Sequence, residues 1–366
     1  MTTSRCSDTP LRYALIGCGR IAPNHIAAAQ ANGLEIAALC DLKRENAMAL
    51  AAKFKLSEVP LYTDYTRMLG EVRPQLAAVA TESGSHAPVA LACIEAGCSV
   101  LIEKPIALSL SDAEKIIVAG KEKGVTVAVC HQNRFNKSVR KIREALETGR
   151  FGKMLYGTAH VRWNRGEEYY RQAPWRGTWA QDGGALMNQC IHNIDLLRWM
   201  MGDYVTEVFA YTANLVHPYL EAEDLGLALV RFKNGALGVI EGTTAVYPVN
   251  LEETLYLFGE KGTVKAGGKS VNALEEWRFG DGEDTAEEVK AACSDNPPNV
   301  YGYGHTPLYT DVIDAVKRHR PPAVDGEAGR RALELVLAVY SSAARGTPVS
   351  LPLKDCATTD FAGMFL

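Results

Sequence analysis

The sequence lacks the features that mark membrane proteins and nucleic-acid-binding proteins. Its predominantly apolar stretches, such as Val125–Cys130 and Leu333–Val339, are far shorter than the ~20 residues of a membrane-spanning helix. Its 39 basic and 43 acidic side chains give a formal net charge of -4, without the positive excess that attracts polyanions. The first ten residues contain no apolar signal-peptide core. We therefore expect a cytoplasmic protein with neither a membrane nor a nucleic acid as its partner.

Paired cysteine motifs are also missing. The chain has nine cysteines, an odd number, and none of them forms a C-x-x-C or C-x-x-H pattern. This spacing argues against a disulfide framework and against a zinc site. Most cysteines, for example Cys40, Cys93 and Cys130, lie in apolar runs and are expected to be small buried hydrophobes. We predict no metal.

Strand-like and helix-like segments alternate through the first 130 residues. The nearly continuous apolar runs are 13–16, 36–40, 76–80, 99–102 and 125–130. Such runs predict a parallel sheet that is buried on both faces. From about residue 150, longer strands mix polar and apolar residues, and Asn234-Gly235 marks a hairpin. The fold class is therefore predicted to be α/β, with a parallel-sheet domain over 1–130 and a second, largely antiparallel domain over 131–366.

The turn after the first strand reads G-x-G-x-x-A, from Gly17 through Gly19 to Ala22. Gly17 permits a tight turn, Gly19 lets a pyrophosphate approach the backbone, and Ala22 lets the following helix pack closely. A plain strand–helix turn also contains such glycines, so the motif depends on its context. That context, a strand before it and a helix after it, favours a dinucleotide-binding Rossmann domain.

Asp41 ends the second apolar run, 22 residues after Gly19. An acid at this strand tip hydrogen-bonds the adenosine ribose and repels a 2′-phosphate, which favours NAD over NADP. Lys43 and Arg44 lie close enough to leave NADP open. A simpler alternative is that Asp41 caps the next helix.

Two further motifs carry candidate catalytic groups. Glu103-Lys104-Pro105 follows the strand at 99–102, at the sheet edge where ligands of such folds bind. Asn188 and His192 are four residues apart on a predicted helix over 186–201, and histidine is suited to accepting a hydroxyl proton near neutral pH. The plainer alternatives are a solvated Glu-Lys pair and a core histidine partnered by Asp195.

In this order, the three motifs resemble the Gfo/Idh/MocA family of nicotinamide-dependent oxidoreductases, and the likeness covers nearly the whole chain. The resemblance implies a C-terminal α/β domain on a large open mixed, mostly antiparallel sheet. That sheet would serve substrate binding and assembly into a dimer or tetramer, while a helix near 329–345 packs back on the Rossmann domain. It also implies NAD as the cofactor, held by Gly17, Gly19, Arg20, Ile21, Asp41, Thr81, Ser83, His86, Glu103, Lys104, Trp175 and Arg176. Lys104 and His192 would be the catalytic residues.

One departure from the family pattern points to a subgroup. Many sugar and inositol dehydrogenases of the family carry Asp four residues before the histidine, whereas this chain has Asn188. Asn188 would orient the substrate or the imidazole by hydrogen bonds. Five fragments, at 81–86, 133–136, 175–179, 184–189 and 301–305, are similar to enzymes that oxidise the 3-hydroxyl of UDP-N-acetylglucosaminuronate. Substrate residues implied for this nucleotide sugar are Arg134, Arg162, Arg165, Tyr169, Trp179, Asn188, His192 and His305.

The residues between 162 and 179 suit such a substrate on chemical grounds. Arginines alternate here with tryptophans and tyrosines. Guanidinium groups pair with phosphate and carboxylate, and aromatic rings stack on a base or a sugar face. A solvated amphipathic loop is the plainer alternative, although exposed aromatic residues at this density are costly.

The predicted reaction is hydride transfer from a sugar carbon to NAD. His192 would act as general base, Lys104 would stabilise the developing alkoxide, and Asn188 would position the substrate. The resemblance also allows 2-oxoglutarate to reoxidise NADH. Three alternatives stay open: a dehydrogenase of a free sugar or inositol, an NAD-dependent glycosidase, and a non-enzymatic NAD-binding protein.

Overall fold

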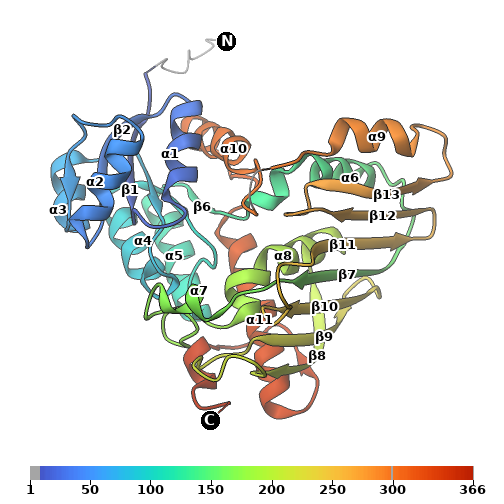
Figure 1. The fold of residues 1–366 in the computed structure, drawn as a ribbon. Coiled ribbons are helices and arrows are strands. Elements are labelled where there is room, and N and C mark those ends of the chain that lie inside the picture. Colours follow the sequence, from blue (N-terminus) through green and yellow to red (C-terminus); the bar gives the residue numbers. More distant parts are fainter. Residues whose placement is uncertain (1–8, 298–299, 366) are drawn as a thin grey trace. The chain divides into compact units, whose positions relative to one another are not determined.

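The computed structural model describes residues 9–297 and 300–365, which form two compact units (Figure 1). Unit 1 comprises residues 9–107, Ser111–Cys130 and His305–Arg330. Unit 2 comprises Leu108–Leu110, His131–Gly304 and residues 331–365. A segment close to the end of the chain is therefore part of the unit that the first residues build.

Unit 1 is built on a six-stranded parallel sheet in the order β3-β2-β1-β4-β5-β6. Its strands are β1 (Arg12–Ile16), β2 (Glu35–Cys40), β3 (Leu61–Tyr62), β4 (Leu76–Val79), β5 (Ser99–Ile102) and β6 (Val127–Val129). Its helices are α1 (Ala22–Ala31), α2 (Arg44–Lys53), α3 (Tyr65–Val72), α4 (His86–Glu95), α5 (Leu110–Lys123) and α10 (His305–Arg318). Every residue of β4 and β5 is buried, which agrees with a sheet covered on both faces. The predicted Rossmann sheet is confirmed.

Unit 2 is built on an eight-stranded mixed sheet in the order β13-β12-β11-β7-β10-β9-β8-β14. Its strands are β7 (Met154–Arg162), β8 (Val205–Ala213), β9 (Leu225–Phe232), β10 (Leu237–Thr243), β11 (Glu252–Gly259), β12 (Gly262–Gly267), β13 (Ala273–Phe279) and β14 (Val349–Ser350). Its helices are α6 (Lys137–Glu147), α7 (Glu167–Arg171), α8 (Ile191–Met200) and α9 (Ala286–Cys293). Helix α11 (Gly326–Arg345) contributes its first residues to unit 1 and the rest to unit 2. Between the described strands of this sheet, β7 and β10 pair in parallel and the other pairs are antiparallel, as expected for the second domain.

The two faces of the eight-stranded sheet differ. Helix α8 packs on one face so closely that a Cβ on Gly157 of β7 would lie 2.9 Å from the Met201 sulfur. Large apolar side chains on the other face are exposed, among them Leu227, Leu229 and Val239. The alternation along β9, buried then exposed, produces this difference.

The helix predicted over 186–201 is present in two parts. A π-helical turn at Leu186–Cys190 precedes α8, so Asn188 lies on the wider turn and His192 on the regular helix. Single π turns of this kind occur often at functional sites. Among the described residues, no helix combines the length and apolar character of a membrane span, and the described cysteines form no disulfide.

Candidate active site

The glycine-rich turn of unit 1 accepts no larger residue at its first position. Gly17 has a φ of 95°, and a Cβ there would lie 2.3 Å from the carbonyl oxygen of Ala80. At Gly19 the space is open for 4 Å around the Cβ position. The exposed Arg20 and half-buried Ile21 follow, immediately before α1 begins at Ala22. The turn therefore holds β1 against β4 and leaves the backbone at Gly19 open to a diphosphate.

Asp41 lies at the carboxyl end of β2 and is fixed by three donors. Its carboxylate accepts the backbone N–H of Cys18 at 2.8 Å, that of Lys43 at 2.8 Å, and the side-chain amide of Asn46 at 3.1 Å. The alternative that Asp41 caps α2 is wrong, because Lys43 occupies the N-cap position. A half-buried carboxylate bound to the glycine-rich turn fits the role of a ribose acceptor.

The loops after β4 and β5 are joined by His86. Its Nδ1 lies 2.6 Å from the carbonyl oxygen of Pro105, and its Nε2 lies 3.2 Å from that of Thr81. Burial lowers the pKa of this imidazole. His86 is 1% exposed and Ser83 is also buried, so His86 connects two loops from within the unit. The Lys104–Pro105 peptide bond is cis and Lys104 is partly exposed.

His305, implied as a substrate residue, lies in unit 1 at the start of α10 and is buried. Its Nε2 is 3.9 Å from Glu103. Glu103 is buried too, and its carboxylate is directed to His25 and to the backbone of Lys104. The side chains of His305 and Glu103 therefore make their contacts inside unit 1. Solvent does not reach either of them to an appreciable extent.

In unit 2, Arg134 is buried in an ion pair. Its guanidinium binds both carboxylate oxygens of Asp195 at 2.7 and 2.6 Å and stacks on Trp199. Coulombic attraction from Arg134 outweighs the effect of burial and holds the pKa of Asp195 well below its usual range. The bidentate pair uses Nε and one Nη of Arg134, and the substrate role predicted for this residue stays a prediction. The half-buried His192 has the ring of His131 edge-on at 5.7 Å.

Asn188 is held by a carboxylate that the sequence pattern did not single out. Its side-chain amide donates to the buried Asp182, which also accepts the N–H of Gly177 at 2.7 Å. The Asn188 oxygen accepts from Gln189 at 2.6 Å. Asp182 comes from the loop before the π turn, six residues upstream, and no spacing rule relates it to His192.

A chain of contacts links Asn188 to the arginine- and aromatic-rich stretch. Gln189 donates to the hydroxyl of Tyr169 at 2.8 Å, and Arg176 donates to the same hydroxyl. The Arg176 guanidinium lies against the ring of Tyr169 and against that of Trp175, 4.2 and 4.4 Å from their centres. Arg165 lies 5.3 Å from the Tyr169 ring centre. Two cations, two aromatic rings and two amides are thus gathered within unit 2.

Arg162 and Trp179 do not join this group. Arg162 lies on the face of the sheet opposite α8, where Glu241 and Glu252 bind its guanidinium. The alternation along β7 determines this, because Val161 and Trp163 point inward. Trp179 is 1% exposed and packs edge-on against Tyr340. The substrate roles of both residues stay predictions.

Replacing Asp182 by Asn is expected to lower kcat about 10-fold and to destabilise the fold by about 1–3 kcal/mol. The substitution places an NH₂ group against either the Gly177 N–H or the Asn188 amide, so Asn188 loses its fixed orientation. Steady-state kinetics and a melting curve measure both effects. Unchanged kinetics in Asp182→Asn would show that Asn188 does not depend on this carboxylate.

Glu223 is fully buried beneath the π turn. It accepts the N–H of Leu186 at 2.8 Å and the hydroxyl of Tyr340 at 2.9 Å, and burial raises its pKa to about 8. Burial likewise raises the pKa of Glu253, which accepts from Asn133, to about 8. Burial therefore favours the neutral form of both carboxyl groups in the folded protein.

The free energy of unfolding is expected to fall as the pH rises from about 5 to about 8. Across this window the folded protein keeps protons on Glu223 and Glu253 that the unfolded chain releases, so unfolding becomes easier. Glu223→Gln, which mimics the protonated acid, should weaken this dependence. Thermal melts at pH 6 and pH 8.5 compare the two proteins. If the melting temperatures of the wild type and of Glu223→Gln fell equally between pH 6 and pH 8.5, groups other than Glu223 would cause the pH dependence.

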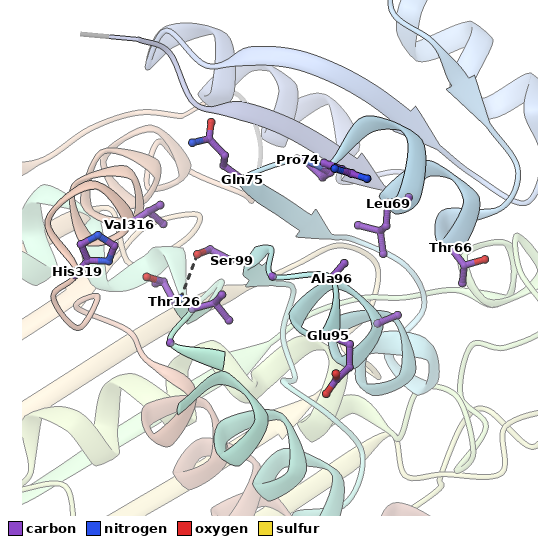
Figure 2. A pocket seen from close by; sticks show the side chains of 16 residues that line it. Thr66, Leu69, Pro74, Gln75, Glu95, Ala96, Ser99, Thr126, Val316 and His319 are labelled. Carbon is purple, nitrogen blue, oxygen red and sulfur yellow. Dashed lines mark hydrogen bonds between the residues drawn. The ribbon is translucent and has the colours of Figure 1, made fainter. Parts of the chain in front are cut away.

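A cavity of about 860 Å³ lies at the opposite edge of the parallel sheet of unit 1. Figure 2 shows Gln75, Ser99 and Thr126, which lie at the amino ends of β4, β5 and β6, together with His319 from the segment after α10. Ligands of such sheets bind at the carboxyl ends of the strands. The cavity is therefore not part of the cofactor site.

Known proteins resemble both units. The family described as "Oxidoreductase family, NAD-binding Rossmann fold" matches residues 11–131, and the "GFO/IDH/MocA C-terminal domain" matches residues 139–265. The WlbA dehydrogenase from Bordetella pertussis, solved with NADH and UDP-GlcNAcA, is 39% identical with a TM-score of 0.88, over 95% of this chain and 99% of that one. WlbA from Chromobacterium violaceum, with the same ligands, is 37% identical with a TM-score of 0.87, over 95% and 98%. Myo-inositol 2-dehydrogenase from Thermotoga maritima is 29% identical over 91% of this chain and 96% of its own length.

Proposed function

Because the chain belongs to the Gfo/Idh/MocA family and is an NAD-dependent sugar dehydrogenase, we propose that its substrate is UDP-N-acetylglucosaminuronate, oxidised at the 3-hydroxyl. The two WlbA structures bind UDP-GlcNAcA together with NADH, and they share more than a third of their residues with this chain. The product would be a 3-keto nucleotide sugar, an intermediate suited to the biosynthesis of bacterial surface polysaccharides.

The observation that carries this proposal is the contact chain from Arg176 through Tyr169 and Gln189 to Asn188. It joins guanidinium and aromatic groups to the turn that precedes His192. A substrate with a diphosphate, a carboxylate and a flat base needs such groups. A free sugar or inositol carries no anionic group that would use them.

Different residues have different proposed roles in the reaction. His192 is the proposed general base for the sugar hydroxyl, and Asn188, held by Asp182, positions the substrate. Lys104 is the proposed donor that stabilises the developing alkoxide. In unit 1, Asp41 and the turn at Gly17–Gly19 would hold the cofactor. When bound, NAD supplies the redox chemistry as hydride acceptor.

The test is absorbance at the NADH band after adding candidate substrates to the protein with NAD. UDP-N-acetylglucosaminuronate should give NADH, while UDP-N-acetylglucosamine, which lacks the carboxylate, should react at least ~10-fold more slowly. Turnover of myo-inositol but not of the nucleotide sugar would overturn the proposed substrate. Bleaching of NADH by 2-oxoglutarate would identify the recycling route.

A further inference from the structure

Glu103 lies at the centre of a buried polar cluster in unit 1. One carboxylate oxygen is 3.0 Å from Nε2 of His25, and the other accepts the backbone N–H of Lys104 at 3.2 Å. Nε2 of His305 is 3.9 Å away, and the Cys130 thiol also hydrogen-bonds the carboxyl group. His25, Glu103, Cys130 and His305 are all at least nine-tenths buried. They come from α1, the end of β5, the end of β6 and the start of α10.

The carboxyl group of Glu103 is ionised although it is buried. Burial by itself raises the pKa, but the hydrogen bond from His25 and the adjacent His305 outweigh that effect and hold the pKa of Glu103 well below its usual range. An ionised carboxylate accepts hydrogen bonds on both oxygens and is stable in the interior only when donors surround it. Its position is therefore determined by the elements that supply those donors.

The cluster extends further into the sheet. Nδ1 of His25 is 2.7 Å from the Tyr309 hydroxyl, which is 2.8 Å from the Tyr13 hydroxyl. These contacts join α1, which begins after the glycine-rich turn, to α10 and to β1. Figure 1 shows α1 and α10 side by side. His25 thus has one ring nitrogen on Glu103 and the other on α10.

We propose that Glu103 is the positioning residue for Lys104. His25 of α1 fixes the buried Glu103 carboxylate, and this carboxylate in turn fixes the backbone of Lys104. This inference rests on the proposed role of Lys104. It differs from the expectation that Glu103 contacts the cofactor, because the carboxylate is turned toward the interior. A lysine displaced by a fraction of an ångström stabilises a developing alkoxide poorly, whereas binding of the adenosine half of NAD is unaffected.

Two substitutions of His25 form a matched pair for the test. In His25→Gln the amide nitrogen lies near the position of Nε2 and still donates to Glu103, while the contact with Tyr309 is lost. In His25→Asn the amide lies near the position of Nδ1, so the contact with Tyr309 is kept and the donor to Glu103 is lost. We expect kcat to fall about 10- to 100-fold in His25→Asn and less than ~3-fold in His25→Gln, with the KM for NAD within ~3-fold in both.

Glu103→Gln and a double variant complete the experiment. Glu103→Gln keeps the shape of the side chain and should lower kcat to the same extent as His25→Asn. Combined with Lys104→Ala it should cause no further loss, because a positioning residue acts only through the residue that it positions. Tyr13→Phe removes a hydroxyl at the far end of the same cluster and should change the melting temperature without changing kcat.

The outcomes separate this inference from the proposed function. Wild-type kcat in Lys104→Ala would refute the role of the lysine and with it this inference. A large loss in Lys104→Ala with wild-type kcat in His25→Asn and Glu103→Gln would refute the positioning role alone. Equal losses in His25→Asn and His25→Gln, or multiplicative losses with Lys104→Ala, would indicate a general structural role. A stoichiometric metal that is present in the wild type and lost in His25→Asn would also overturn the inference, since His25 would then be a metal ligand.

Discussion

Lys104→Ala and His192→Ala are each expected to lower kcat by about 10²-fold or more while NAD still binds. In the proposed mechanism, Lys104 donates a hydrogen bond to the alkoxide and His192 accepts the hydroxyl proton. Each substitution therefore removes an interaction that matters mainly in the transition state. The KM for the sugar should change less than kcat. Steady-state kinetics with the nucleotide sugar, and NAD binding followed by protein fluorescence, measure the two effects separately.

Matched controls come from a lysine and a histidine of unit 1 that lie outside the motifs. Lys121 pairs with Glu327 at the surface, and His319 lines the cavity at the amino ends of the strands. Lys121→Ala and His319→Asn should leave kcat at the wild-type value. If Lys104→Ala or His192→Ala behaved like these controls, the corresponding residue would have no part in the chemistry.

Gly17→Ala is expected to weaken NAD binding more than ~100-fold and to destabilise unit 1 by about 2–5 kcal/mol. The new Cβ would lie 2.3 Å from the Ala80 carbonyl oxygen, which is backbone and cannot rotate away. The φ of 95° is also strained for any residue with a Cβ. Thermal melts of the protein without cofactor and NAD titrations measure the two losses.

Gly70→Ala provides the control for this substitution. Gly70 lies in α3, no atom is within 4 Å of its Cβ position, and alanine has the higher helix propensity. Its melting temperature and NAD affinity should equal or slightly exceed the wild-type values. A Gly17→Ala protein that melts and binds NAD like the wild type would contradict the close packing of β1 against β4.

The features that were predictable from sequence are local. The first two apolar runs, the turn at Gly17 and the acid at Asp41 follow one another within about 30 residues, and backbone geometry relates them directly. The hairpin at Asn234-Gly235 joins β9 to β10 as expected. The Gfo/Idh/MocA resemblance rested on such motifs and was confirmed.

The features that were not predictable depend on contacts between distant residues. Arg162 and Arg165 lie in the same cationic stretch, but the alternation of β7 directs Arg162 to the face of the eight-stranded sheet opposite α8. Trp179 could not be distinguished from Trp175 by composition, because contacts with the distant residues Tyr340 and Phe361 make it a core residue. Asp182 reaches Asn188 through a loop whose shape no spacing rule describes.

The segment 305–330 has a consequence for the order of synthesis. Unit 1 begins with β1 near the amino end, yet α10 supplies the Tyr309 hydroxyl that contacts both His25 and Tyr13. During translation His25 and Tyr13 emerge 284 and 296 residues before their partner, so the dinucleotide-binding unit cannot reach its final packing until almost the whole chain has left the ribosome. A nascent chain stalled before residue 305 should therefore be far more sensitive to protease in β1 and α1 than the released protein.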